Sequence, residues 1–144
     1  MRPNLGFYVQ TINDIVTDTE KIGESMNPSY EEIRTALDED KTESLSADKL
    51  KEISVLFEEG TDKYRAMAKK ISTLRPPAAV MGIHKKFERS YLSYVAGCEE
   101  MLQSIDSEKG IDKKAFDAAE EKQDTATDEI SFSIQRMTNL LLKK

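Results

Sequence analysis

The feature that most constrains the fold is a seven-residue apolar repeat, in which apolar side chains recur at alternating steps of three and four residues. Its most regular occurrence is Leu50, Ile53, Phe57, Gly60, Tyr64, Met67, Ile71 and Leu74. A second regular segment covers residues 80–105, and two less regular segments occupy the first and last quarters of the chain. This spacing places the apolar side chains on one stripe of an α-helix. The repeat therefore predicts long helices that each bury one face.

The repeat defines four helices, and we expect them at about residues 5–40, 46–74, 77–105 and 112–142. Short connections between long helices make neighbouring helices antiparallel. The apolar positions extend beyond each stripe onto one flank, which is typical of a globular bundle and not of a two-stranded coiled coil. The predicted architecture is all-α, an up-down-up-down antiparallel four-helix bundle, with residues 1–144 forming a single domain.

Turn and cap residues predict where these helices are interrupted. Pro28 should kink or break the first helix, because proline lacks a backbone N–H and disfavours helix at the residue before it. Ser46 is a favourable N-cap for the second helix. Pro76-Pro77 ends the second helix and opens the third, and we expect a turn at 106–110 before the fourth. Whether the first helix is continuous through Pro28 stays open.

Composition excludes several classes of protein. A net charge of −6 argues against nucleic-acid binding, since phosphate-contacting domains are normally basic. No apolar run approaches the roughly 18 residues needed to span a membrane. A single cysteine, Cys98, allows neither an intramolecular disulfide nor a thiolate metal cluster. Cys98 lies in the apolar stripe of the third helix, where we expect it to pack as a small apolar residue.

The chain contains one histidine, His84, a residue type that often acts as a general base. It lies in the apolar stripe of the third helix, and spacing fixes no nucleophile or orienting carboxylate beside it. Di-iron bundles use a Glu-x-x-His pattern, but residue 81 is a methionine here. We expect His84 to be hydrogen-bonded across the bundle core. A pH-sensitive role in packing is the alternative, because an unperturbed histidine titrates near pH 6.5.

The many adjacent carboxylates, such as Glu58 and Glu59, point about 100° apart on a helix and cannot share an acid–base role. They lie mostly outside the apolar stripes, which is typical of solvated faces. Glycine-rich phosphate loops, serine elbows, zinc patterns and nucleotide fingerprints are absent from the sequence. The sequence therefore predicts a non-enzymatic protein with no cofactor and no metal site.

Basic residues gather in one stretch, where residues 63–89 hold eight bases and one acid, Glu88. Folding the chain back at Pro76-Pro77 places Arg65 level with Glu88. Heptad positions then turn five bases outward at one end of an otherwise acidic rod, and we expect them to form a basic patch: Arg65, Lys69, Lys85, Lys86 and Arg89. Such a patch can contact phosphate-bearing polymers or anionic lipid headgroups. Alternatively, these charges complement the helix dipole and keep the rod in solution.

Residues 74–94 begin with Leu74-Arg75-Pro76-Pro77 and continue through His84 to Tyr91 and Tyr94. This segment resembles a pattern in small Gram-positive cell-envelope helix-bundle lipoproteins of uncharacterised function. In that family a Leu-x-Pro-Pro turn precedes a helix with an early histidine and spaced aromatic residues. The resemblance implies an extracytoplasmic bundle tethered by a lipid at a cysteine upstream of residue 1. Residues 1–4 carry no such cysteine and no apolar signal region, so a cytoplasmic location stays open.

Two functional hypotheses follow. The first is a non-enzymatic extracytoplasmic binding or structural module of the cell envelope, which contacts anionic polymer or lipid headgroups through the basic patch. The second is a cytosolic interaction or assembly protein that acts through an exposed helix face, with Val9, Val16 and Leu141 buried between subunits. The partner is therefore an unknown protein or an anionic envelope component, and an oligomer is compatible with both hypotheses.

Overall fold

The computed structural model describes residues 5–142, excepting the side chain of residue 142. Most of them form four helices: α1 (Leu5–Asp38), α2 (Ala47–Thr73), α3 (Met81–Gln103) and α4 (Lys113–Leu142). The shorter elements are two 3₁₀ turns, η1 (Thr42–Ser44) and η2 (Ala78–Val80), and two antiparallel two-residue strands, β1 (Ile105–Asp106) and β2 (Gly110–Ile111). The predicted all-α helical bundle is confirmed.

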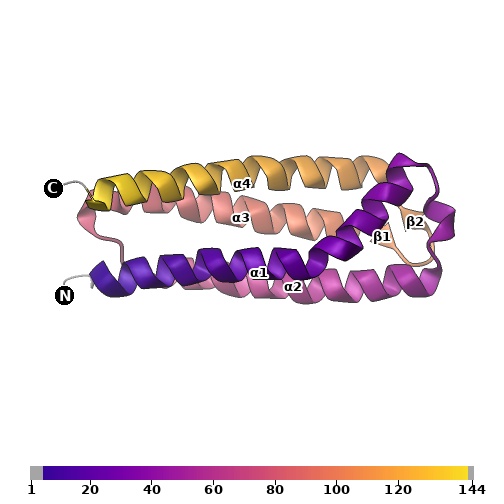
Figure 1. Cartoon of the computed structure of the whole chain (residues 1–144), viewed down its shortest axis with the longest axis horizontal. Helices are drawn as coiled ribbons and strands as arrows, with labels where there is room; N and C mark the ends of the chain where they lie inside the picture. The colour runs from indigo at the N-terminus through magenta and orange to yellow at the C-terminus, as the bar shows by residue number, and fades with distance from the viewer. Residues whose placement is uncertain (1–4, 143–144) are drawn as a thin grey trace.

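The four helices lie along one common axis, and Figure 1 shows which connections share an end of the bundle. The first and last described residues and the α2–α3 connection lie at one end, which we call the terminal end. The α1–α2 connection and the β1–β2 hairpin lie at the other, the hairpin end. The closest packing is between α3 and α4, whereas α1 packs chiefly on α2.

Helix α1 is continuous through Pro28, which answers the question that the sequence left open. Proline removes the N–H that would bond the carbonyl of Glu24, and its ring crowds that carbonyl. The helix bends in its second half but does not end there (Figure 1). Ile33 and Leu37, beyond the proline, are buried in the core and hold the second half of the helix against the bundle.

The helix ends follow the local signals in the sequence. Ser46 caps α2, since its Oγ accepts a hydrogen bond of 3.0 Å from the Lys49 amide. Asp112 does the same for α4 through the Ala115 amide, at 3.1 Å. Asp40, just beyond α1, lies in the left-handed region at φ 55°, and the Lys41 amide donates to the Ala36 carbonyl at 2.7 Å. This pairing is the Schellman arrangement that closes many helices.

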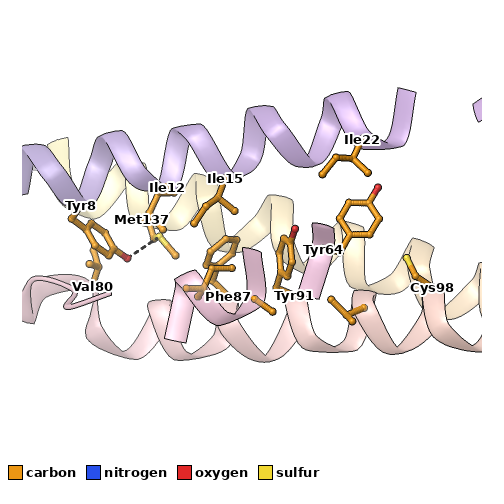
Figure 2. Packing of buried hydrophobic residues seen from close by; sticks show 13 residues of the cluster. Tyr8, Ile12, Ile15, Ile22, Tyr64, Val80, Phe87, Tyr91, Cys98 and Met137 are labelled. Atoms are coloured by element: carbon orange, nitrogen blue, oxygen red, sulfur yellow. Dashed lines mark hydrogen bonds between the residues drawn. The ribbon is translucent and has the colours of Figure 1, made fainter. Parts of the chain in front are cut away.

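The core divides into two clusters along the bundle. The first lies toward the terminal end and is rich in aromatic side chains, with Tyr8, Tyr64, Phe87 and Tyr91 among its members (Figure 2). The second lies toward the hairpin end. Its buried members are Ile33, Leu37, Leu50, Ile53, Phe57, Met101, Ile105, Phe116 and Ala119. Most of the predicted stripe residues of α2 are buried in one cluster or the other.

Gly97 sets the close approach of α3 to α4. A Cβ atom built on Gly97 would lie 2.8 Å from Gln123 Cγ and 3.3 Å from both the Ala119 carbonyl oxygen and the Gln123 amide nitrogen. Two of these neighbours are backbone atoms that cannot move independently. The Gln123 amide group also donates a hydrogen bond of 3.1 Å to the Gly97 carbonyl. The absence of a side chain at residue 97 therefore permits the tightest helix pair of the bundle.

Candidate functional site

His84 lies inside the terminal-end core and has a hydrogen-bond partner on each ring nitrogen. Tyr8 Oη lies 2.7 Å from its Nδ1, and the Ile71 carbonyl oxygen lies 3.3 Å from its Nε2. These distances fit a neutral imidazole in which Nε2–H donates to Ile71 and Nδ1 accepts from the Tyr8 hydroxyl. Burial lowers the pKa of His84, and the hydrogen bond to Ile71 opposes that shift. His84 thus lies within the core and has no open face for a substrate.

Cys98 is also buried, at the side of the aromatic cluster (Figure 2). Burial raises the pKa of its thiol to about 12. The thiol is therefore protonated at neutral pH and is a poor nucleophile. Within residues 5–142, no group of three or more His, Cys, Asp and Glu side chains is arranged to hold a metal ion.

The five bases of the predicted patch differ in their contacts and in their exposure. Arg65 is engaged by carboxylates, because its Nη2 lies 2.8 Å from Glu99 Oε2 while its Nη1 contacts Asp62 and lies 3.8 Å from Glu58. The prediction that Arg65 lies level with Glu88 is wrong. Tyr64 packs edge-on against Tyr94, with 5.1 Å between ring centroids. Residues of α2 therefore lie beside α3 residues several positions later in the sequence than a tight turn at Pro76-Pro77 would place there.

Lys86 is half-buried and contacts an aromatic ring at the surface of α4. Its ammonium lies 4.9 Å from the centroid of the Phe132 ring on α4, a cation–π contact. The remaining three bases, Lys69, Lys85 and Arg89, are exposed. The structure thus brings three of the five predicted bases to the surface with no carboxylate within ion-pair distance in the described part of the chain.

Further exposed bases that heptad positions do not place in the patch lie at the same end. Lys70 and Arg75 are exposed at the end of α2 and just beyond it, and Arg136 is exposed near the end of α4. None of these three forms an ion pair with another described residue. We call the surface formed by Lys69, Lys70, Arg75, Lys85, Arg89 and Arg136 the basic end.

Large apolar side chains are exposed beside the basic end. Leu5 and Phe7, at the start of α1, are 49% and 63% exposed, and Met81, at the start of α3, is 48% exposed. All three lie at the terminal end, where α1 and α3 begin (Figure 1). None of the described helices has the length and apolar character needed to cross a membrane.

A second candidate site lies between α1 and α4. Tyr8 Oη reaches Met137 Sδ at 3.6 Å near the terminal end (Figure 2), and Arg34 reaches Asp117 at 2.9 Å near the hairpin end. Between these contacts the two helices leave two cavities, of about 590 Å³ and 480 Å³. Gly23 and Tyr94 line both cavities, so the cavities adjoin. We call the pair the α1–α4 groove.

The larger cavity holds an unsatisfied acid. Glu120 Oε1 is buried and has no hydrogen-bond partner among the described residues, and the other carboxylate oxygen lies 3.6 Å from Arg34 Nη1. Burial raises the pKa of Glu120, and the charge of Asp124 raises it further. The cavity is also lined by Tyr64, whose hydroxyl has its pKa raised to about 12 by burial. The wall of the larger cavity is therefore acidic.

The groove was not predicted from the sequence, although two residues signalled it. Pro28, which removes one backbone N–H from α1, lies in the wall of the larger cavity, and Gln123, a polar residue in the apolar stripe of α4, lies in the facing wall. A comparison of the chain with protein-family models, with curated proteins and with solved structures finds no match in any of the three.

Proposed function

We propose that the protein is a non-enzymatic helical module that docks through its basic end on an anionic, phosphate-bearing surface. The observation that carries this proposal is the charge of the terminal end. The six bases of the basic end are exposed and have no carboxylate within ion-pair distance in residues 5–142, and Glu88 is the one acid in the basic stretch 63–89. Uncompensated positive charge of this kind attracts phosphate groups, with about 1 kcal/mol for each base close to an anionic lipid surface.

The exposed apolar side chains favour lipid headgroups over a free polymer. Leu5, Phe7 and Met81 are exposed at the same end as the bases. Apolar side chains beside lysine and arginine are typical of proteins that lie on a membrane interface, where the apolar groups enter the headgroup region. A polymer in solution offers no apolar phase to receive them.

The test compares two variants with the same net charge. The first variant carries Lys69→Glu, Lys70→Glu, Lys85→Glu and Arg89→Glu in the basic end. The second carries Lys51→Glu, Lys109→Glu, Lys113→Glu and Lys114→Glu, which reverse four bases on α2, the hairpin and α4 away from the terminal end. We expect the first variant to lose sedimentation with phosphatidylglycerol vesicles at low salt, and the second to retain it. Equal binding by the two variants, with circular dichroism showing both folded, would contradict the proposal.

A second pair of measurements separates lipid from polymer. Replacing Leu5 and Met81 by serine should weaken binding to phosphatidylglycerol vesicles and leave binding to soluble poly(glycerol phosphate) unchanged. Binding to both should fall with added salt, because screening shortens the range of exposed charges. The placement in the cell envelope belongs to the same proposal and is supported by the resemblance of residues 74–94 to envelope lipoproteins.

The alternative, an assembly protein, is favoured by a different observation. Leu92 on α3 and Phe132 on α4 are 51% and 54% exposed away from the ends of the bundle. Of the three side chains expected at such an interface, Val9 is 37% exposed, Val16 lines the groove, and Leu141 packs against the core. An interface would therefore use Leu92 and Phe132. Sedimentation equilibrium tests this function, since a monomer at all concentrations contradicts it.

A further inference from the structure

The α1–α4 groove has the dimensions and the lining of a ligand site. Its two cavities, of about 590 Å³ and 480 Å³, each fall within the roughly 300–1,000 Å³ typical of small-molecule pockets. The two cavities differ in chemistry. That difference, and not the volume alone, indicates what the groove would bind.

The larger cavity combines aromatic rings with carboxylates. The rings of Tyr30, Phe57, Tyr64 and Tyr94 line it, together with the carboxylates of Glu24, Glu120 and Asp124. No lysine, arginine or histidine lines either cavity within the described residues. Ring faces and carboxylates both attract positive charge, and aromatic pockets are a recurrent way of binding organic ammonium ions.

Glu120 Oε1 lacks a hydrogen-bond donor among the described residues. A buried acceptor without a donor destabilises the folded protein, and more so when the acceptor is charged. Arg34 cannot meet this need, because it already donates to Asp38 and Asp117 at 2.9 Å and lies 3.6 Å from the other oxygen of Glu120. An N–H donor carried by a ligand would satisfy Glu120 Oε1.

The smaller cavity is suited to an apolar chain. Val16, Phe87, Tyr91, Ile130 and Ile134 form much of its wall. The Tyr91 hydroxyl already has a partner, since it lies 2.7 Å from Thr19 Oγ1. The smaller cavity adjoins the larger one at Gly23, where a Cβ atom would be 3.5 Å from Tyr64 Oη.

We propose that the α1–α4 groove binds an organic ammonium ion that carries an apolar chain. The ammonium group donates to Glu120 Oε1 among the tyrosine rings of the larger cavity, and the chain extends past Gly23 into the smaller cavity. This site is separate from the basic end, and its charge preference is the opposite one.

The first test measures the charge preference of the groove by titration calorimetry with decylammonium. Decanoate, an anion with the same number of carbon atoms, is the matched comparison. We expect decylammonium to bind and Glu120→Gln to weaken that binding about tenfold or more. Glu121→Gln is the matched control, because Glu121 neighbours Glu120 but is exposed and does not line the groove. Unaltered affinity in Glu120→Gln, or an equal loss in Glu121→Gln, would overturn the proposal.

The second test locates the apolar chain by fluorescence. The protein contains no tryptophan, so a single introduced tryptophan reports on its own surroundings. Ser131→Trp places the reporter in the wall of the smaller cavity, and Glu129→Trp places it at an exposed position of α4 outside the groove. We expect decylammonium to shift the emission of the first variant to shorter wavelength and to leave the second unchanged. An equal shift in both, or an equal shift of the Ser131→Trp emission with decanoate, would refute the site.

Discussion

At the scale of single residues, His84 illustrates how burial decides chemistry. Its two ring nitrogens are occupied by the Tyr8 hydroxyl and by the Ile71 carbonyl, and no described serine, threonine or cysteine is hydrogen-bonded to it. A proton added at Nδ1 would place a positive charge in the core, where burial disfavours it. The burial that suits the neutral imidazole therefore opposes its charged form.

This arrangement predicts a pH-dependent contribution to stability. The folded-state pKa of His84 is lowered chiefly by burial, so below about pH 6.5 the unfolded chain takes up a proton that the folded protein resists. The contribution of His84 is thus fully present above pH 6.5 and declines as the pH falls. We expect His84→Gln to reduce the free energy of unfolding more at pH 7.5 than at pH 5.5, as measured by urea denaturation. A difference between variant and parent that is constant with pH would contradict this.

At the scale of elements, Gly97 controls the packing of α3 on α4. Replacing glycine by alanine inside a helix ordinarily stabilises it by about 0.5–1 kcal/mol. Gly97→Ala should instead destabilise the protein by about 1–3 kcal/mol, because the new methyl group would meet the α4 backbone. Gly82→Ala, in the same helix, is the control, since a Cβ there has no neighbour within 4 Å. In thermal unfolding, Gly82→Ala should have a higher Tm than the parent, and Gly97→Ala should have a lower one.

The extent to which the sequence predicts these elements follows from how local each signal is. Ser46 and the apolar stripes act through neighbours a turn or two away, so the helices and the α2 cap could be predicted. The effect of Pro28 could not, because continuity of α1 depends on the burial of Ile33 and Leu37 against other helices. Arg65 was misplaced for a related reason, since its contact with Glu99 depends on the register between α2 and α3.

At the scale of the whole molecule, the groove could not be predicted, because it depends on how far α1 stands from α4. Two long-range contacts, Tyr8 with Met137 and Arg34 with Asp117, fix that separation at either end. Neither pair is signalled by spacing along the chain. The basic end was predicted in outline, since charge segregation is visible in the sequence, whereas the loss of Arg65 and Lys86 from it required the side-chain contacts.

The unequal packing of the helices predicts unequal protection from hydrogen exchange. Helix α1 packs chiefly on α2 and is separated from α4 by the groove, whereas α3 and α4 pack closely along their lengths. Segments with fewer packed neighbours open at lower free energy. We expect amides of residues 9–27 in α1 to exchange faster than those of residues 116–130 in α4, as measured by mass spectrometry of peptic peptides. Equal protection of the two segments would contradict this.

The separation of charge along the bundle gives the molecule a dipole moment parallel to its long axis. Residues 31–62 and 99–129, which fold into the half at the hairpin end, each hold eleven acids and four bases, opposite the basic end. The field of an anionic surface exerts a torque on such a dipole and turns the molecule before contact. The bundle would then arrive standing on its terminal end, with the α1–α4 groove along its upright side and open to the surrounding solution.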